Sequence, residues 1–104
     1  MIFIVVKFQV KPDWIDRWVE LVTPFTDATR AEPGNLWFEW SRSLDDPAEF
    51  VLVEAFRDAG TAHVTSSHFA TAMATLPQAL VATPKIISQT VAQSGWDQLG
   101  EMEV

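Results

Sequence analysis

The chain alternates between strand-like and helix-like segments, and the order of these segments limits the folds open to it. Four segments are rich in β-branched and aromatic residues, as strands are: 2–10, 36–43, 50–56 and 85–92. Two others repeat apolar residues every three or four positions, as helices with one buried face do: 12–28 and 58–80. The predicted order is therefore strand, helix, strand, strand, helix, strand.

Turn-forming residues separate these segments. The run Glu32-Pro33-Gly34-Asn35 ends the first helix, because proline resists continuing a helix and glycine accepts left-handed backbone. The polar stretch 44–49 predicts a hairpin between the second and third strands. Within the helices we expect a kink or a break at Pro24, which has no backbone donor. We expect another break at Ser66 or Ser67, since either serine can cap a new helix.

This order is that of a ferredoxin-like α+β domain, in which a four-stranded antiparallel sheet carries both helices on one face. At 104 residues the chain suits one domain, and we expect residues 1–92 to form it, with 93–104 as a C-terminal extension. The strands are so apolar that the helix-free face needs a cover, and a second copy is the simplest cover. We therefore predict a homodimer, with Trp96, Leu99 and Met102 packing at its interface.

Composition argues against several kinds of partner. A net charge of −7, with only seven lysines and arginines, is unsuited to nucleic acid, whose binding needs a basic patch. No apolar run approaches the roughly 20 residues of a membrane span, and the start of the chain is typical of a strand rather than a secretory leader. We expect a cytoplasmic protein that binds neither nucleic acid nor membrane.

Both histidines of the chain, His63 and His68, lie in the segment 62–69. Histidine is the side chain that most readily exchanges protons near neutral pH, and the chain has no cysteine. A continuous helix would set the two rings about 140° apart around its axis, since each residue turns about 100°. A break near Ser66 would allow both to reach one pocket. The two histidines are therefore candidate bases.

A pair of histidines also suggests a metal site. Neither histidine has a carboxylate three or four residues away, and cysteine is absent, so we predict no metal. Glu39 and Glu54 stand out within apolar strands, and a buried carboxylate needs a partner. We expect structural ion pairs in which Arg42 or Arg57 provides the positive charge.

Three blocks of the sequence resemble the antibiotic biosynthesis monooxygenase family, which includes quinol monooxygenases. They are the run from Glu32 to Glu39, the hairpin 45–56 and the segment 62–69, and they occur in family order. The resemblance implies a dimeric α+β barrel, in which two ferredoxin-like sheets face each other. Some members use molecular oxygen without metal, flavin or haem. The resemblance therefore implies a cofactor-independent monooxygenase that acts on a phenolic or quinol-type aromatic.

Another branch of this family degrades haem. Its members typically offer a tryptophan and then a histidine iron ligand on the second helix, where this chain has His63 and Met73. They also use an asparagine near the position of Lys7. We interpret these differences as evidence against haem degradation, and we expect no cofactor.

For the implied oxidation, a histidine would remove a proton from the substrate in a dry pocket, and the resulting anion would react with oxygen. We expect His63 or His68 to be this catalytic base. We further expect six substrate-binding residues, of which four line a slot between sheet and helices and two orient a hydroxyl or the imidazole. The slot residues are Phe38, Trp40, Phe69 and Met73, and the orienting residues are Asn35 and Glu54.

Two alternatives stay open. One is isomerisation of a small hydroxycarbonyl compound by the same base without oxygen. A phosphorylated substrate of that kind would need Lys7, Arg42 or Arg57 at the pocket mouth. The other is a dimeric ligand-binding module without catalysis, which histidines facing solvent would favour.

Overall fold

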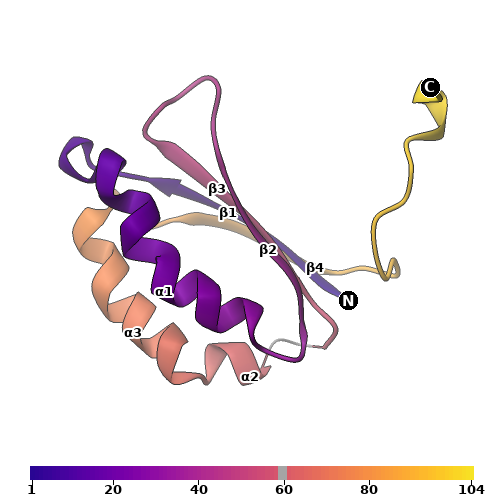
Figure 1. The fold of residues 1–104 in the computed structure, drawn as a ribbon, viewed down its shortest axis with the longest axis horizontal. Coiled ribbons are helices and arrows are strands. Elements are labelled where there is room, and N and C mark those ends of the chain that lie inside the picture. Colours follow the sequence, from indigo (N-terminus) through magenta and orange to yellow (C-terminus); the bar gives the residue numbers. More distant parts are fainter. Residues whose placement is uncertain (59–60) are drawn as a thin grey trace.

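A computed structural model describes residues 1–58 and 61–104, and it contains one antiparallel sheet with helices on one face (Figure 1). The strands are β1 (Ile2–Gln9), β2 (Asn35–Arg42), β3 (Glu49–Phe56) and β4 (Lys85–Thr90). The helices are α1 (Trp18–Arg30), α2 (Thr61–Val64) and α3 (Ser67–Thr75), and short 3₁₀ turns occupy Pro12–Arg17, Leu76–Ala79 and Gly100–Met102. The predicted ferredoxin-like α+β fold is confirmed. The expected start of the second helix, at 58, adjoins residues 59–60, which lie outside the described residues.

The strand order in the sheet is β2-β3-β1-β4, so β1 and β3 form its centre. Alternate residues of each strand face the helices, because side chains alternate between the two faces of a sheet. Val6 of β1 lies opposite Leu52 of β3, and both are buried. Phe38 of β2 lies opposite Glu54 on the same face. Glu54 is therefore a carboxyl group placed in the middle of the core-facing surface.

The helix α1 closes the core with three apolar side chains on one face. Trp18, Val22 and Phe25 follow the helical period and are all buried. The Trp18 ring packs against Phe8 of β1, with the ring centroids 5.3 Å apart. Each such side chain contributes about 1.5–3 kcal/mol through removal from water. This packing fixes α1, and the turn that follows it, over the sheet.

Pro24 lies inside the continuous helix α1, so of the kink or break expected at this residue the break does not occur. A proline in a helix interior costs about 3 kcal/mol. Val22 and Phe25 on either side of it are buried in the core, and their packing offsets this cost. The change of helical form lies earlier, where the 3₁₀ turn Pro12–Arg17 passes into α1.

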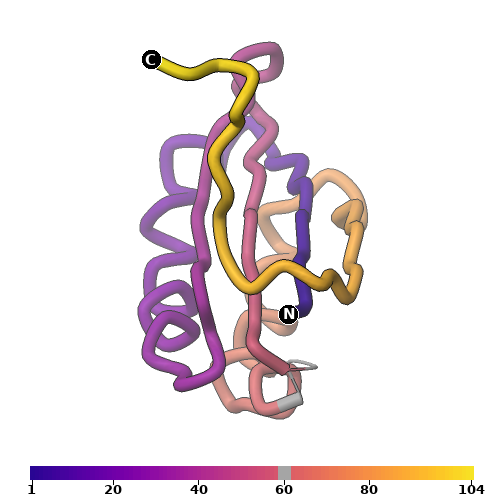
Figure 2. Tube along the Cα trace, turned by 90° about the vertical axis from the view of Figure 1, so that its right-hand side faces the viewer, coloured from indigo at the N-terminus to yellow at the C-terminus, as the bar shows by residue number. Residues whose placement is uncertain are grey.

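The C-terminal segment lies on the side of the sheet away from the helices. In Figure 2 it is nearest the viewer, with the strands and then the helices further back. Trp96 packs against Trp37 of β2 with ring centroids 5.2 Å apart, so Trp37 faces away from the core. Leu99 and Met102 are exposed, and the segment that carries them extends away from the sheet (Figure 1). In the described part of the chain, every helix is too short or too polar to cross a membrane.

Candidate active site

Ser66 divides the helical segment 61–75 in two and thereby sets the directions of both histidines. The helix α2 ends at Val64 and α3 begins at Ser67, so the predicted break is confirmed. The Ser66 hydroxyl donates to the carbonyl oxygen of His63 at 2.6 Å and accepts from the backbone N–H of Phe69 at 3.1 Å. One side chain thus ties the end of α2 to the start of α3.

This break brings His63 and His68 to one carboxylate, that of Glu32. The Oε2 atom of Glu32 lies 2.8 Å from Nδ1 of His63 and 2.5 Å from Nε2 of His68. The turn after α1 holds Glu32 in place. Its backbone N–H donates to the carbonyl of Thr29 at 3.0 Å, and its carbonyl accepts from the N–H of Asn35 at 3.1 Å. Three side chains from distant parts of the sequence therefore share one hydrogen-bonded centre.

The shared carboxylate determines which nitrogen of each ring carries a hydrogen. An ionised carboxylate only accepts hydrogen bonds, so the two nitrogens that face Glu32 are the protonated ones. In neutral rings this leaves lone pairs on Nε2 of His63 and on Nδ1 of His68. Each ring is then an oriented base whose partner carboxylate stabilises the charge it gains on protonation.

The His63 ring is enclosed by phenylalanines and is only 5% exposed. Its centroid lies 4.9 Å from that of Phe56, 5.1 Å from Phe69 and 5.6 Å from Phe25. In such apolar surroundings a hydrogen bond to a carboxylate is stronger than in water. His63 therefore anchors Glu32 from inside the core.

His68 occupies the solvent side of the same carboxylate. Its side chain is 23% exposed, and it lines a groove of about 410 Å³ between α1 and α3. Leu21, Phe25 and Leu76 give this groove an apolar wall. A small planar molecule in the groove would therefore meet an apolar surface and one oriented imidazole.

Glu54 is a buried carboxyl group that interacts with this cluster. Burial, and secondly the negative charge of Glu32, raise the pKa of Glu54 to about 7. Its neighbours across the sheet, Ile4 and Phe38, are apolar. Among residues 1–58 and 61–104, no cation forms an ion pair with Glu54. Near neutral pH this carboxyl is divided between its protonated and ionised forms.

The predicted ion pairs of the strand glutamates are therefore wrong in the described part of the chain. Arg42 donates through Nε to the carbonyl of Pro47 at 2.7 Å, and Arg57 donates through a terminal nitrogen to the carbonyl of Pro33 at 3.1 Å. Glu39 is exposed and needs no partner. Both arginines therefore donate hydrogen bonds to backbone carbonyls of turns and do not neutralise strand carboxylates.

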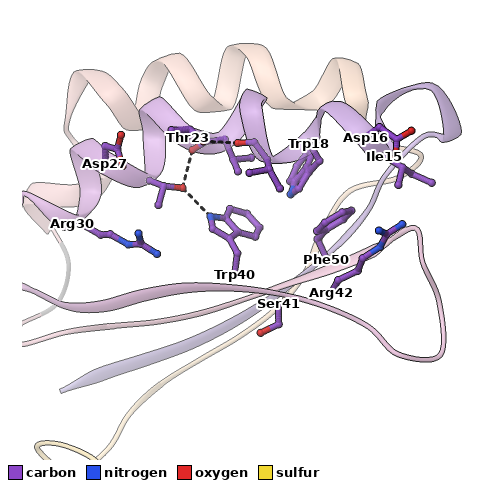
Figure 3. Close-up of a pocket in the computed structure, with 13 residues that line it drawn as sticks. Ile15, Asp16, Trp18, Thr23, Asp27, Arg30, Trp40, Ser41, Arg42 and Phe50 are labelled. Carbon is purple, nitrogen blue, oxygen red and sulfur yellow. Dashed lines mark hydrogen bonds between the residues drawn. The ribbon is translucent and has the colours of Figure 1, made fainter.

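A larger groove, of about 630 Å³, lies between α1 and the edge strand β2 (Figure 3). Trp40 lines it (Figure 3) and donates through Nε1 to the hydroxyl of Thr26 at 2.8 Å. That hydroxyl donates in turn to the carbonyl of Val22 at 2.7 Å. Neither histidine lines this groove. Of these two grooves, the one between α1 and α3 is lined by a histidine.

The residues predicted to bind substrate are spread over several places. Phe38 and Phe69 lie close to His63, with centroids 6.4 Å and 5.1 Å from its ring. Trp40 lines the other groove, and Met73 is half exposed. The amide of Asn35 donates to two backbone carbonyls of the sheet. The structure thus brings the two phenylalanines to the histidines, sets Glu54 within the electrostatic influence of Glu32, and leaves the other three residues elsewhere.

Sequence analysis missed Glu32 as a site residue, because it is 31 residues from His63 and 36 from His68. Glu32 begins one of the family-like blocks, but we gave this residue no role beyond the turn that ends the first helix. The prediction of no metal rested on the lack of a carboxylate one turn from either histidine. The fold supplies a carboxylate from a distant turn, and the three possible ligand atoms lie within 4.8 Å of one another.

Comparison with known proteins agrees with this picture. The family model described as antibiotic biosynthesis monooxygenase matches residues 1–75. A Nitrosomonas europaea structure, a candidate antibiotic biosynthesis monooxygenase, is 27% identical with a TM-score of 0.81 and covers 89% of this chain and 100% of its own. A conserved protein from Methanosarcina mazei Go1 is 26% identical with a TM-score of 0.79, and the match covers 85% of this chain and 89% of that protein. A Deinococcus radiodurans structure shares the fold at 20% identity, with a TM-score of 0.82. That match covers 94% of this chain and 99% of the other. A comparison with curated proteins finds no match.

Proposed function

Because the chain belongs to the antibiotic biosynthesis monooxygenase family, we propose that it oxidises a phenolic or quinol-type aromatic with molecular oxygen, without a cofactor. His68 is the base in this proposal. The observation that carries it is the 2.5 Å contact between Glu32 and the Nε2 atom of His68, at the wall of an apolar groove. Glu32 and His63 act as positioning residues, since they hold and polarise the ring that meets the substrate.

The reaction needs only a proton acceptor and a dry site. His68 takes the hydroxyl proton through Nδ1, and the phenolate passes one electron to oxygen to give a radical pair. The pair recombines with a new C–O bond at a ring carbon that is ortho or para to the oxygen and carries a hydrogen, and the imidazolium returns its proton to the peroxide. Cleavage of the O–O bond with loss of the hydrogen on that carbon releases water and leaves a second carbonyl. One oxygen atom enters the product and the other leaves as water.

The test is oxygen uptake with a panel of naphthols, dihydroxynaphthalenes and anthrones, assayed with EDTA present because the proposal requires no metal. We expect uptake and quinone formation in a one-to-one ratio. Turnover of a hydroxycarbonyl substrate without oxygen would favour isomerisation instead. Binding of the aromatics without any turnover would favour a ligand-binding module.

We also propose that two copies pair through the helix-free face of the sheet. Phe3, Val5 and Val53 present apolar side chains there, and Ile87 of β4 is 68% exposed on the same face. Exposed apolar residues also continue into the C-terminal segment. A self-complementary patch of this kind suits a two-fold dimer, and covering it would bury the side chains that the helices leave open.

A further inference from the structure

The cluster that orients His68 also has the composition of a transition-metal site. Glu32 offers one carboxylate oxygen, and His63 and His68 each offer one ring nitrogen. Two imidazoles and a carboxylate suit zinc, whereas magnesium and calcium prefer oxygen ligands alone. We propose that Glu32, His63 and His68 together bind one Zn²⁺ ion. This binding does not depend on the proposed oxidation.

The spacing of the ligand atoms supports the proposal. Zinc bonds of about 2.0–2.2 Å set two ligand atoms of a tetrahedral ion about 3.3 Å apart. The two contacts of the Glu32 oxygen, at 2.8 Å and 2.5 Å, are shorter than this spacing, and no pair in the cluster exceeds 4.8 Å. The proposal therefore requires the Glu32 oxygen to move by less than about 1 Å from each ring nitrogen, to the spacing of about 3.3 Å.

The surroundings supply a rigid inner wall and a route of entry. The phenylalanines around His63 hold its ring in the core, so one ligand is fixed before the ion arrives. His68 lines the groove between α1 and α3, so the ion can enter from solvent.

Zinc binding and base catalysis exclude each other in this cluster. The ion takes the lone pair of the ring nitrogen that faces Glu32, so the hydrogen moves to the other nitrogen of His68. That nitrogen is the one through which His68 would accept a proton. If the proposed function holds, Zn²⁺ therefore inhibits the oxidation.

The experiment is isothermal titration of the untagged chain with ZnCl₂, with MgCl₂ as the unsuited ion. We expect one Zn²⁺ per chain and no heat from Mg²⁺. Glu32→Gln and His68→Ala each remove a ligand and should weaken binding by at least about 100-fold, because even outer-shell changes cost about 10- to 100-fold. Glu20→Gln removes an exposed carboxylate of α1 and should leave the affinity unchanged.

A second measurement does not depend on variants that fold. Co²⁺, which is coloured, can replace Zn²⁺ and report binding by visible absorption. The X-ray absorption spectrum of zinc bound to the wild-type chain should fit coordination by two imidazoles and one carboxylate. Zinc affinity that is the same in Glu32→Gln as in the wild type would overturn the proposal, and so would a spectrum without imidazole ligands. Neither result would affect the proposed oxidation, which is measured with EDTA present.

Discussion

The hydroxyl oxygen of Ser66 lies 3.1 Å from the backbone nitrogen of Phe69 and caps α3 at the point where it turns away from α2. Without this turn, His63 and His68 would lie on different sides of one helix. With it, both reach the same oxygen of Glu32. The geometry of the site therefore depends on a helix cap.

Replacing this cap should weaken the fold and the site together. Ser66→Ala removes the acceptor for the Phe69 N–H and should lower the free energy of unfolding by about 1 kcal/mol, measured by urea titration. Ser67→Ala, at the exposed neighbouring position, is the matched control and should change stability by less than half as much. Equal stabilities of the two variants would show that Ser66 does not hold the break.

The raised pKa of Glu54 should appear in the pH dependence of stability. Its pKa is about 7 in the folded chain, against an ordinary value of 4.5, so between these values the folded state holds a proton that the unfolded state releases. The stability contributed by this group is present below pH 4.5 and is lost as the pH rises to about 7, a loss of about 3 kcal/mol.

Glu54→Gln removes this dependence. The free energy of unfolding of the variant, relative to that of the wild type, should therefore be higher at pH 8 than at pH 5. Urea unfolding of variant and wild type at both pH values gives the difference, in which the other titrating groups cancel. Glu39→Gln, on the exposed side of β2, should follow the wild type. If the free energy of unfolding of Glu54→Gln changes with pH as steeply as that of the wild type, the raised pKa of Glu54 is contradicted.

Dimerisation through the helix-free face of the sheet predicts that substitutions at two neighbouring residues of β4 differ in their effect on the dimer. Ile87 is 68% exposed and lies on the helix-free face, while Ile86 is 62% exposed and lies on the other face, opposite Val6. Ile87→Glu should convert the dimer to a monomer in light scattering, and Ile86→Glu should not. If Ile86→Glu alone dissociates the dimer, the interface lies on the other face.

Glu32 should matter to the reaction more than its position in a turn suggests. Glu32→Gln removes the negative charge that stabilises a protonated His68, so kcat should lose part of the roughly 100- to 10,000-fold that base catalysis contributes. Glu20→Gln should have the wild-type kcat. An unchanged kcat in Glu32→Gln, with the fold intact by circular dichroism, would remove the carboxylate from the mechanism.

The fold could be predicted from sequence because its signals are local. The apolar periods of β1 and α1, and the capping serine between the histidines, each reflect neighbours a few residues apart. The break expected at Pro24 does not occur, because a tertiary effect, the burial of Val22 and Phe25, outweighs the local cost of the proline. Local preference is only a weak guide where packing decides.

The site was harder to predict because its parts meet only after folding. Periodicity placed the histidines on a broken helix, but no pattern links Glu32 to residues more than 30 positions away. The arginines expected to neutralise strand carboxylates bind backbone carbonyls instead, which leaves Glu54 with its raised pKa. Contacts between side chains that are distant in the sequence depend on how the loops pack. Composition and hydrophobic periodicity do not predict that packing.

The central claim is that His68, held by Glu32, removes a proton from the aromatic substrate. The most direct test is the rate of oxygen uptake by His68→Gln with a dihydroxynaphthalene, since glutamine keeps a donor toward Glu32 but cannot accept the proton. We expect kcat to fall at least about 100-fold, while the fold and substrate binding are retained. Wild-type oxygen uptake by His68→Gln would contradict the central claim.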